Sequence, residues 1–231
     1  MNSMHLHHEK HFQGSEMLSD IVIGMSDGLT VPFALAAGVS QAGVSNYVIV
    51  TAVIAEIVAG SIAMGLGGYL AGQTEREHYF NELKREYDEV EHLPEREKQE
   101  IKEILAHYNI SENIQNQLVE ELSKDKDKWV EFMMQFELGL SEPDIHRAKK
   151  SALNIGLSYI AGGLVPLIPY MVTNTPQEGF QWSVILTIIA LMIFGYIKSK
   201  ATGQHPLKGS LKTMLVGLTA AFAAYFVAKL F

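Results

Sequence analysis

The chain contains no cysteine among its 231 residues. Disulfide bonds, thiolate metal sites and cysteine nucleophiles are therefore excluded. Any metal site in this protein must use carboxylate, imidazole, thioether or backbone oxygen ligands.

Several functional motifs are also missing. The 18 basic residues are outnumbered by 26 acidic ones and form no basic patch of the kind that nucleic acid requires, so nucleic-acid binding is set aside. The sequence contains no glycine-rich phosphate loop, Walker motif or Ser-His-Asp arrangement. These absences argue against ATP-driven pumping by this chain.

Charge is concentrated in one segment. Between Glu75 and Asp144 lie 20 of the 26 acidic residues, and between Arg76 and Lys150 lie 12 of the 18 basic residues. This segment therefore carries a formal charge of −8, which equals that of the whole chain. Because the remainder is largely apolar, the sequence predicts two unlike parts.

Five apolar segments stand outside the charged region, at residues 18–40, 47–73, 151–173, 181–199 and 209–230. Each is close to the ~20 residues that span a ~30 Å hydrocarbon layer. We predict an all-α membrane protein with five transmembrane helices and a cytosolic helical bundle inserted between helices 2 and 3. The predicted domains are a polar His-rich tail (1–17), helices 1 and 2 (18–73), a metal-binding bundle (74–150) and helices 3 to 5 (151–231).

The distribution of lysine and arginine predicts the orientation. The 41–46 and 174–180 loops contain neither residue, whereas four lysines lie in or beside the 200–208 turn. If the four lysines, the charged segment and the N-terminus face the cytosol, 17 of the 18 basic residues fall on that side of the membrane. We therefore place the N-terminus and the 74–150 bundle in the cytosol. The polar stretch Met1–Gly14 is not a cleavable signal peptide, so the first span directs insertion.

Two acids lie inside predicted spans. Asp27 is in the first span, and Glu56 is in the second. A carboxylate at this depth is costly, which makes an ion or proton pathway the default hypothesis. Met64 follows Glu56 by eight residues and shares its helix face. Its thioether favours transition metals over Mg²⁺ and Ca²⁺, although a membrane methionine can also be apolar filler.

Small residues recur beside these positions. Gly24 and Gly28 form a GxxxG pair in the first span, and Gly68 and Gly72 form another in the second. This spacing predicts close helix packing, either within the chain or with a second copy. Pro166 and Pro169 interrupt the third span and predict either a cavity-lining break or a packing kink.

The charged segment contains carboxylates at helical spacing. Glu86 and Glu89 are three residues apart, as are Glu97 and Glu100, with Glu103 three further on. Pro94, which opens the second helix of the segment, can fold the two sets face to face. Converging carboxylates repel one another and raise one another's pKa unless a cation joins them, which indicates a divalent metal site.

A second group of candidate ligands follows near the end of this segment: Met133, Met134 and Glu137. The alternative for both groups is a solvated charged face over a bundle core that contains the methionines. Glu89-Val90-Glu91-His92 is a Glu-x-x-His unit, which di-metal carboxylate sites use twice and which occurs once here. The histidines of the N-terminal tail can bind a metal only loosely; they are His5, His7, His8 and His11.

With these residues identified, residues 15–231 resemble the vacuolar iron transporter family of plants, fungi and related microbes. The resemblance rests on five segments: Ser26–Ala36 (SDGLTVPFALA), Ala55–Tyr69, Glu82–Glu86 (ELKRE), Phe132–Leu140 (FMMQFELGL) and Gly162–Tyr170 (GGLVPLIPY).

The resemblance implies a homodimer with five spans per protomer, in a lipid bilayer, that exchanges Fe²⁺ for protons. Mn²⁺, Co²⁺, Ni²⁺ and Zn²⁺ are further candidate ions, and no prosthetic group is expected. It also implies vacuolar membrane localisation in a eukaryote and plasma membrane localisation in a prokaryote. By correspondence, Asp27, Met64 and Glu56 line the transport path, and the cytosolic metal ligands are Glu86, Glu89, Glu97, Glu100, Met133, Met134 and Glu137.

We therefore predict a secondary-active transporter, not an enzyme, that moves Fe²⁺ out of the cytosol. Three alternatives remain open at this point. The transported ion can be Mn²⁺ or a broad range of divalent ions. The chain can be a membrane-anchored di-metal carboxylate oxidase, or a metal receptor that does not transport.

Overall fold

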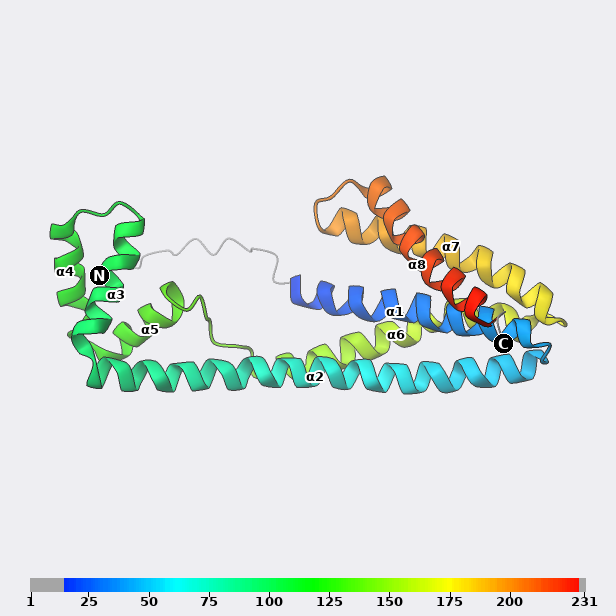
Figure 1. Cartoon of the computed structure of the whole chain (residues 1–231), viewed down its shortest axis with the longest axis horizontal. Helices are drawn as coiled ribbons and strands as arrows, with labels where there is room; N and C mark the ends of the chain where they lie inside the picture. Colours follow the sequence, from blue (N-terminus) through cyan, green and yellow to red (C-terminus); the bar gives the residue numbers. More distant parts are fainter. Residues whose placement is uncertain (1–14, 229–231) are drawn as a thin grey trace, which may run out of the picture. The chain divides into compact units, whose positions relative to one another are not determined.

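The computed structural model describes residues 15–228 and divides the chain into two compact units. The first, here the apolar unit, comprises Met1–Tyr69 and Ala148–Phe231, and the second, here the acidic unit, comprises Leu70–Arg147. Over the described range the chain forms eight α-helices and one 3₁₀ turn, with no strand (Figure 1). The predicted all-α class is confirmed. The histidine cluster of the tail lies outside the described residues.

The apolar unit contains α1 (Ser15–Val39), the first half of α2 (Asn46–His92), α6 (Arg147–Val172), α7 (Pro176–Ala201) and α8 (Pro206–Ala228). A 3₁₀ turn, η1 (Ser40–Ala42), ends at Gly43, whose φ of 68° suits glycine and lets α2 start at once. Helices α7 and α8 form an antiparallel hairpin that packs on α1 (Figure 1).

Four helices within the described part of the chain are long and apolar enough to cross a membrane. They are Glu16–Ala42, Asn46–His92, Arg147–Val172 and Pro176–Ala201. These helices cover the first four predicted spans. Helix α8 covers the fifth predicted segment but is not among the four, so the fifth span stays a prediction.

Helix α6 passes through both of its prolines, Pro166 and Pro169, without ending. Helix α1 likewise contains Pro32. Ser183 of α7 donates a 2.8 Å hydrogen bond to the Pro166 carbonyl oxygen, so a buried hydroxyl anchors α7 at the proline segment of α6.

Helices α1 and α6 approach one another through glycines. A methyl group on Gly24 would overlap the carbonyl oxygen of Ile155, and one on Gly28 would overlap that of Tyr159. On α6, a methyl group on Gly162 would lie 2.8 Å from the backbone nitrogen of Leu29. The GxxxG pair of the first span therefore serves a contact within the chain.

The acidic unit contains the second half of α2 together with α3 (Pro94–His107), α4 (Glu112–Leu122) and α5 (Lys126–Phe136). Pro94 occupies the first turn of α3, as predicted, and the Asp125 side chain caps α5. Eight residues form the core: Val90, Ile101, Leu105, Val119, Trp129, Val130, Met133 and Met134.

Two details of the acidic unit differ from the expectation. The charged stretch after residue 74 does not start a separate helix, because α2 runs unbroken for 47 residues. Hydropathy falls near Thr74 because the residues of α2 become polar and charged there. A fall in hydropathy does not end a helix by itself, and neither a proline nor a turn signal occurs at this point. The helical spacing of the apolar residues from Trp129 to Leu140 predicts one helix, whereas α5 ends at Phe136 and leaves Leu140 outside it.

The glycine contact between α1 and α6 gives a first prediction. Gly28→Ala should destabilise the protein by about 1–3 kcal/mol, because the added methyl group meets rigid backbone. The measurement is thermal unfolding of the purified protein in detergent. Gly67→Ala on α2 is the matched control, since no atom lies within 4 Å of the added methyl group. Equal stability of the two variants would contradict the packing described here.

Candidate functional site

Three carboxylates of the acidic unit converge on one point. Glu86 of α2, Glu97 of α3 and Glu137 at the C-terminal cap of α5 each place a carboxylate oxygen within 4.8 Å of the others. We name this group the carboxylate cluster. It brings together one residue from each of the three sets that the sequence indicated.

Glu86 and Glu97 are buried with little compensation, whereas Glu137 lies at the exposed side of the cluster. Glu86 is 1% exposed and Glu97 is 0% exposed. Both carboxylate oxygens of Glu97, and Oε2 of Glu86, are buried without a hydrogen-bond partner. The nearest cation to Glu86 is the half-exposed Arg85, whose guanidinium lies 3.7 Å from Oε1. Burying an unpaired charge is so costly that such groups normally bind a proton or a metal ion.

Burial raises the proton affinity of all three acids. It raises the pKa of Glu86 from 4.5 to about 7, with the charges of Glu137 and Glu89 adding to the effect. It raises the pKa of Glu97 to about 7 in the same way, with Glu100 and Glu86 as the next causes. The pKa of Glu137 is also raised, first by burial and then by the charges of Glu100 and Glu89. With pKa values of about 7, Glu86 and Glu97 hold protons near neutral pH when no cation is bound.

Glu89 and Glu100 lie at the rim of the cluster. They are 27% and 23% exposed, and each faces an arginine: Arg85 is 3.6 Å from Glu89, and Arg96 is 2.9 Å from Glu100. Both are close enough for their charges to act on the buried acids. Glu103 is different: it is exposed and accepts a hydrogen bond from Gln99. Each three-residue step turns the helix by about −60°, so the third residue of the set leaves the face.

Met133 and Met134 lie in the core of the bundle, 0% and 2% exposed. Their packing among apolar side chains matches the alternative that the sequence left open, and their role as ligands stays a prediction. His92 is exposed, and its Nδ1 lies 2.8 Å from the backbone oxygen of Asp88. The Glu-x-x-His unit is therefore not part of the carboxylate cluster.

A second set of polar groups lies in the apolar unit. The hydroxyl of Tyr159 on α6 donates a short hydrogen bond to Glu56 of α2, and the other carboxylate oxygen of Glu56 is buried without a partner. Asp27 of α1 is close enough to act electrostatically on Tyr159. The three side chains join α1, α2 and α6, and we name them the membrane triad. Met64 follows Glu56 on α2 and is half-buried.

Sequence reasoning missed Tyr159 and a further acid, Asp20. Asp20 is 2% exposed and accepts hydrogen bonds from Ser151 at 2.9 Å and from Asn154 at 3.4 Å, both on α6. It precedes Asp27 by seven residues, which puts both acids on the same face of α1. That spacing was the available signal. No sequence pattern pointed to Tyr159, which depends on the packing of α6 against α2.

These groups can perform two kinds of chemistry. The carboxylate cluster offers oxygen ligands without a bound countercharge, which suits a divalent cation and couples its binding to proton release. The membrane triad offers carboxylates at a depth where an ion or a proton can be held only by specific partners.

Several known proteins that are similar to this chain carry the name vacuolar iron transporter. A family model described as the VIT family matches residues 18–229. The chain is 48% identical over 228 residues to "Vacuolar iron transporter 1" of Tulipa gesneriana, covering 99% of this chain and 92% of that protein. It is 48% identical over 223 residues to "Vacuolar iron transporter 1" of Arabidopsis thaliana, covering 96% and 89%. "Protein CCC1" of Saccharomyces cerevisiae is 38% identical over 223 residues, covering 93% and 69%.

The raised pKa values predict a pH-dependent stability. In the folded protein the pKa of Glu97 is about 7 against an ordinary 4.5, so the folded state binds the proton more tightly than the unfolded chain. With a chelator present, the free energy of unfolding should therefore fall as the pH rises from about 4.5 to about 7. Thermal unfolding in detergent across this range measures the effect.

Glu97→Gln should flatten this pH dependence, because the amide cannot ionise. Glu103→Gln on the same helix is the matched control and should keep the wild-type profile, since Glu103 is exposed. A wild-type midpoint that stays constant across this range would contradict the burial of these acids.

Proposed function

Because the chain belongs to the VIT family, as its motifs predict, we propose that it carries Fe²⁺ out of the cytosol in exchange for protons. The observation that carries the proposal is the pairing of uncompensated buried carboxylates with apolar helices of spanning length. The relatives named vacuolar iron transporters support iron as the substrate and a vacuole-like compartment as the destination. In a prokaryotic cell the corresponding route would lead outward across the plasma membrane.

In the proposed cycle, the segment 74–150 is a cytosolic metal-binding domain. Fe²⁺ displaces the protons of Glu86, Glu97 and Glu137, and Glu89 and Glu100 enlarge the negative field at the rim. Met133 and Met134 would supply soft ligands after a shift of side chains, since both are now packed in the core. Oxygen and thioether ligands bind Fe²⁺ less firmly than thiolates would, which suits an ion that must be passed on.

Asp27, Glu56 and Met64 are the proposed ligands of the transport path. The free oxygen of Glu56 is available to an ion, while Tyr159 holds the other oxygen in place. Protonation of Asp27 and Glu56 from the far side would remove their negative charge, release the ion and return protons inward. Moving a charge of +2 against 100 mV costs about 4.6 kcal/mol, which the exchanged protons must supply where the destination is positive.

The proposed assembly is a homodimer with five spans in each protomer. Helix α8 supports the fifth span, because its 23 residues extend about 35 Å, enough for a bilayer core. The N-terminus and the 74–150 domain are proposed to face the cytosol. Mn²⁺ is the next candidate ion, with Co²⁺, Ni²⁺ and Zn²⁺ after it, because carboxylate and thioether ligands accept all of them.

Transport is tested by Fe²⁺ entry into proteoliposomes that contain a metal-quenched dye and a pH dye, under an imposed pH gradient. We expect metal entry accompanied by proton exit. Asp27→Asn should reduce the metal flux at least tenfold, because the path loses a charged ligand. Glu178→Gln, an exposed acid at the start of α7, is the control and should retain flux.

Retained Fe²⁺ flux in Asp27→Asn would contradict the proposed path. Binding without flux in the wild type would favour a receptor, and oxygen consumption on addition of Fe²⁺ would favour an oxidase. Addition of Mn²⁺ to the same assay tests selectivity through competition.

The cytosolic site is tested by equilibrium binding of Mn²⁺, which resists oxidation in air. Glu97→Gln should weaken binding at least tenfold, because a neutral amide replaces a buried anionic ligand. Glu95→Gln on the same helix is the matched control, since Glu95 is exposed and pairs with Lys98 at 2.6 Å. Equal affinities of the two variants would place the binding site elsewhere.

A further inference from the structure

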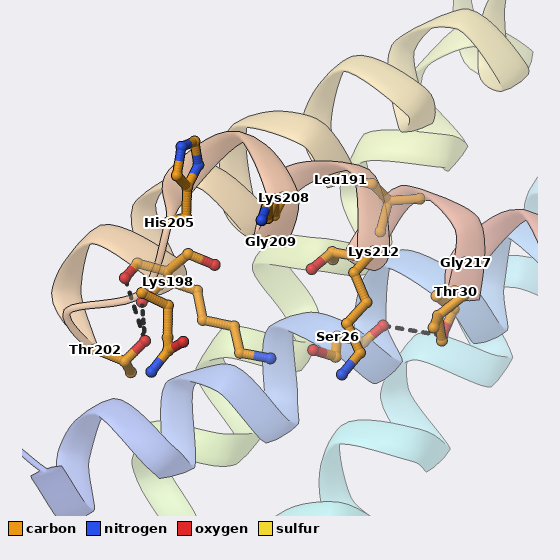
Figure 2. A pocket seen from close by; sticks show the side chains of 14 residues that line it. Ser26, Thr30, Leu191, Lys198, Thr202, His205, Lys208, Gly209, Lys212 and Gly217 are labelled. Carbon is orange, nitrogen blue, oxygen red and sulfur yellow. Dashed lines mark hydrogen bonds between the residues drawn. The ribbon is translucent and has the colours of Figure 1, made fainter.

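A cavity of about 480 Å³ lies in the apolar unit between α1, α7 and α8 (Figure 2). It extends from the turn between α7 and α8 to Ser26 and Thr30 on α1. Neither the carboxylate cluster nor the membrane triad lines it. The proposed transport function therefore leaves it unexplained.

The cavity is strongly cationic. Lys198, Lys208 and Lys212 line it together with His205, and none of its lining residues is acidic. Figure 2 shows the side chains of Lys198 and Lys212 extending toward the α1 side of the cavity. Such a site repels Fe²⁺ and favours an anion. Neutral polar residues also line the cavity, and the remaining lining residues are apolar or glycine. The polar ones are Ser26, Thr30, Ser199, Thr202, Gln204 and Thr213.

The walls of the cavity are fixed by tight packing of α7 on α8. A methyl group on Gly209 would overlap the hydroxyl of Ser199, and one on Gly195 would lie 2.8 Å from Thr213. A methyl group on Gly217 would overlap Leu191 and lie 3.3 Å from Thr30. The lysines therefore lie on two helices that are held close together by contacts at glycines, not on a loose loop.

The cavity lies at the C-terminal end of α7, where a membrane surface is expected if α7 spans a bilayer. Helix α7 is long and apolar enough to span a bilayer and ends at Ala201, so its last turn with Lys198 lies near the headgroups. Lys212 is the seventh residue of α8, about 9 Å along the helix from its start. None of the three lysines has an ion-pair partner among the described residues. A cation at this depth is expensive without a counter-charge.

We propose that this cavity is a phosphate site, which accepts either the headgroup of an anionic phospholipid or a soluble phosphate. Basic recesses between spanning helices bind phosphorylated headgroups through such lysines. The hydroxyls of Thr30 and Thr202 already donate to backbone oxygens of α1 and α7. The other polar lining groups, Ser26, Ser199, Gln204 and Thr213, are the donors left for phosphate oxygens. The site shares α1 with Asp27, which directly follows the lining residue Ser26.

The test is a binding titration of the purified full chain in detergent. The signal is the shift of the protein's thermal unfolding midpoint as the probe is added. The two probes are a short-chain phosphatidylinositol 4-phosphate and inorganic phosphate, with short-chain phosphatidylcholine as the reference lipid. Lys198→Gln/Lys212→Gln should weaken binding roughly 30-fold, about fivefold for each lysine. Lys149→Gln/Lys200→Gln removes two basic charges outside the cavity and should leave the affinity nearly unchanged.

Loss of affinity in the cavity variant for the phosphoinositide alone would support the proposal with a lipid as the source. The same loss for inorganic phosphate as well would support it with a soluble source. Equal weakening by the control variant, or binding that does not exceed that of phosphatidylcholine, would overturn the proposal. Should the double variant fail to fold, Lys208→Gln provides the test, since Lys208 is an exposed lining residue whose loss should cost about fivefold.

Discussion

The backbone contact between α1 and α6 is the constraint on which the apolar unit depends. Gly24, Gly28 and Gly162 remove the side chains that would keep the two helices apart. The contact at Gly28 fixes the backbone of Tyr159, and the Tyr159 hydroxyl in turn holds Glu56. A packing requirement in one helix pair therefore determines the position of a polar group on a third helix. The position of Glu56 therefore depends on the glycine contact between α1 and α6.

The acidic unit follows a different rule, in which packing forces like charges together. Its apolar core draws α2, α3 and α5 close enough to bury Glu86 and Glu97 beside Glu137. A soluble bundle could replace these acids with apolar residues and gain stability. Their presence is what the proposed metal-binding role would require. The pKa of each acid is raised because burial and the neighbouring negative charges both disfavour its ionised form.

Much of this organisation could be predicted from the sequence, because membrane spans depend on composition alone. The apolar segments gave the helices of the apolar unit within a few residues, and Pro94 gave the start of α3. The spacing of the glutamates predicted that carboxylates would converge, but not which of them would be buried. Whether Glu97 or Glu103 is buried depends on which face α3 turns toward the bundle core. Tyr159 could not be found, because a single polar residue acquires its partner only when distant segments pack.

The unpartnered carboxylates also connect the stability of the protein with the ion that it is proposed to transport. A ligand that binds only the folded state stabilises it by about 2.7 kcal/mol at 100 times its dissociation constant. If the proposed cation binds at the carboxylate cluster, the acidic unit, with both oxygens of Glu97 unsatisfied, is the part that gains this stability. When the cation is scarce, the bundle would then open more often and expose the chain to proteases. The lifetime of the chain in the cell would then follow the supply of the ion, without any separate regulator.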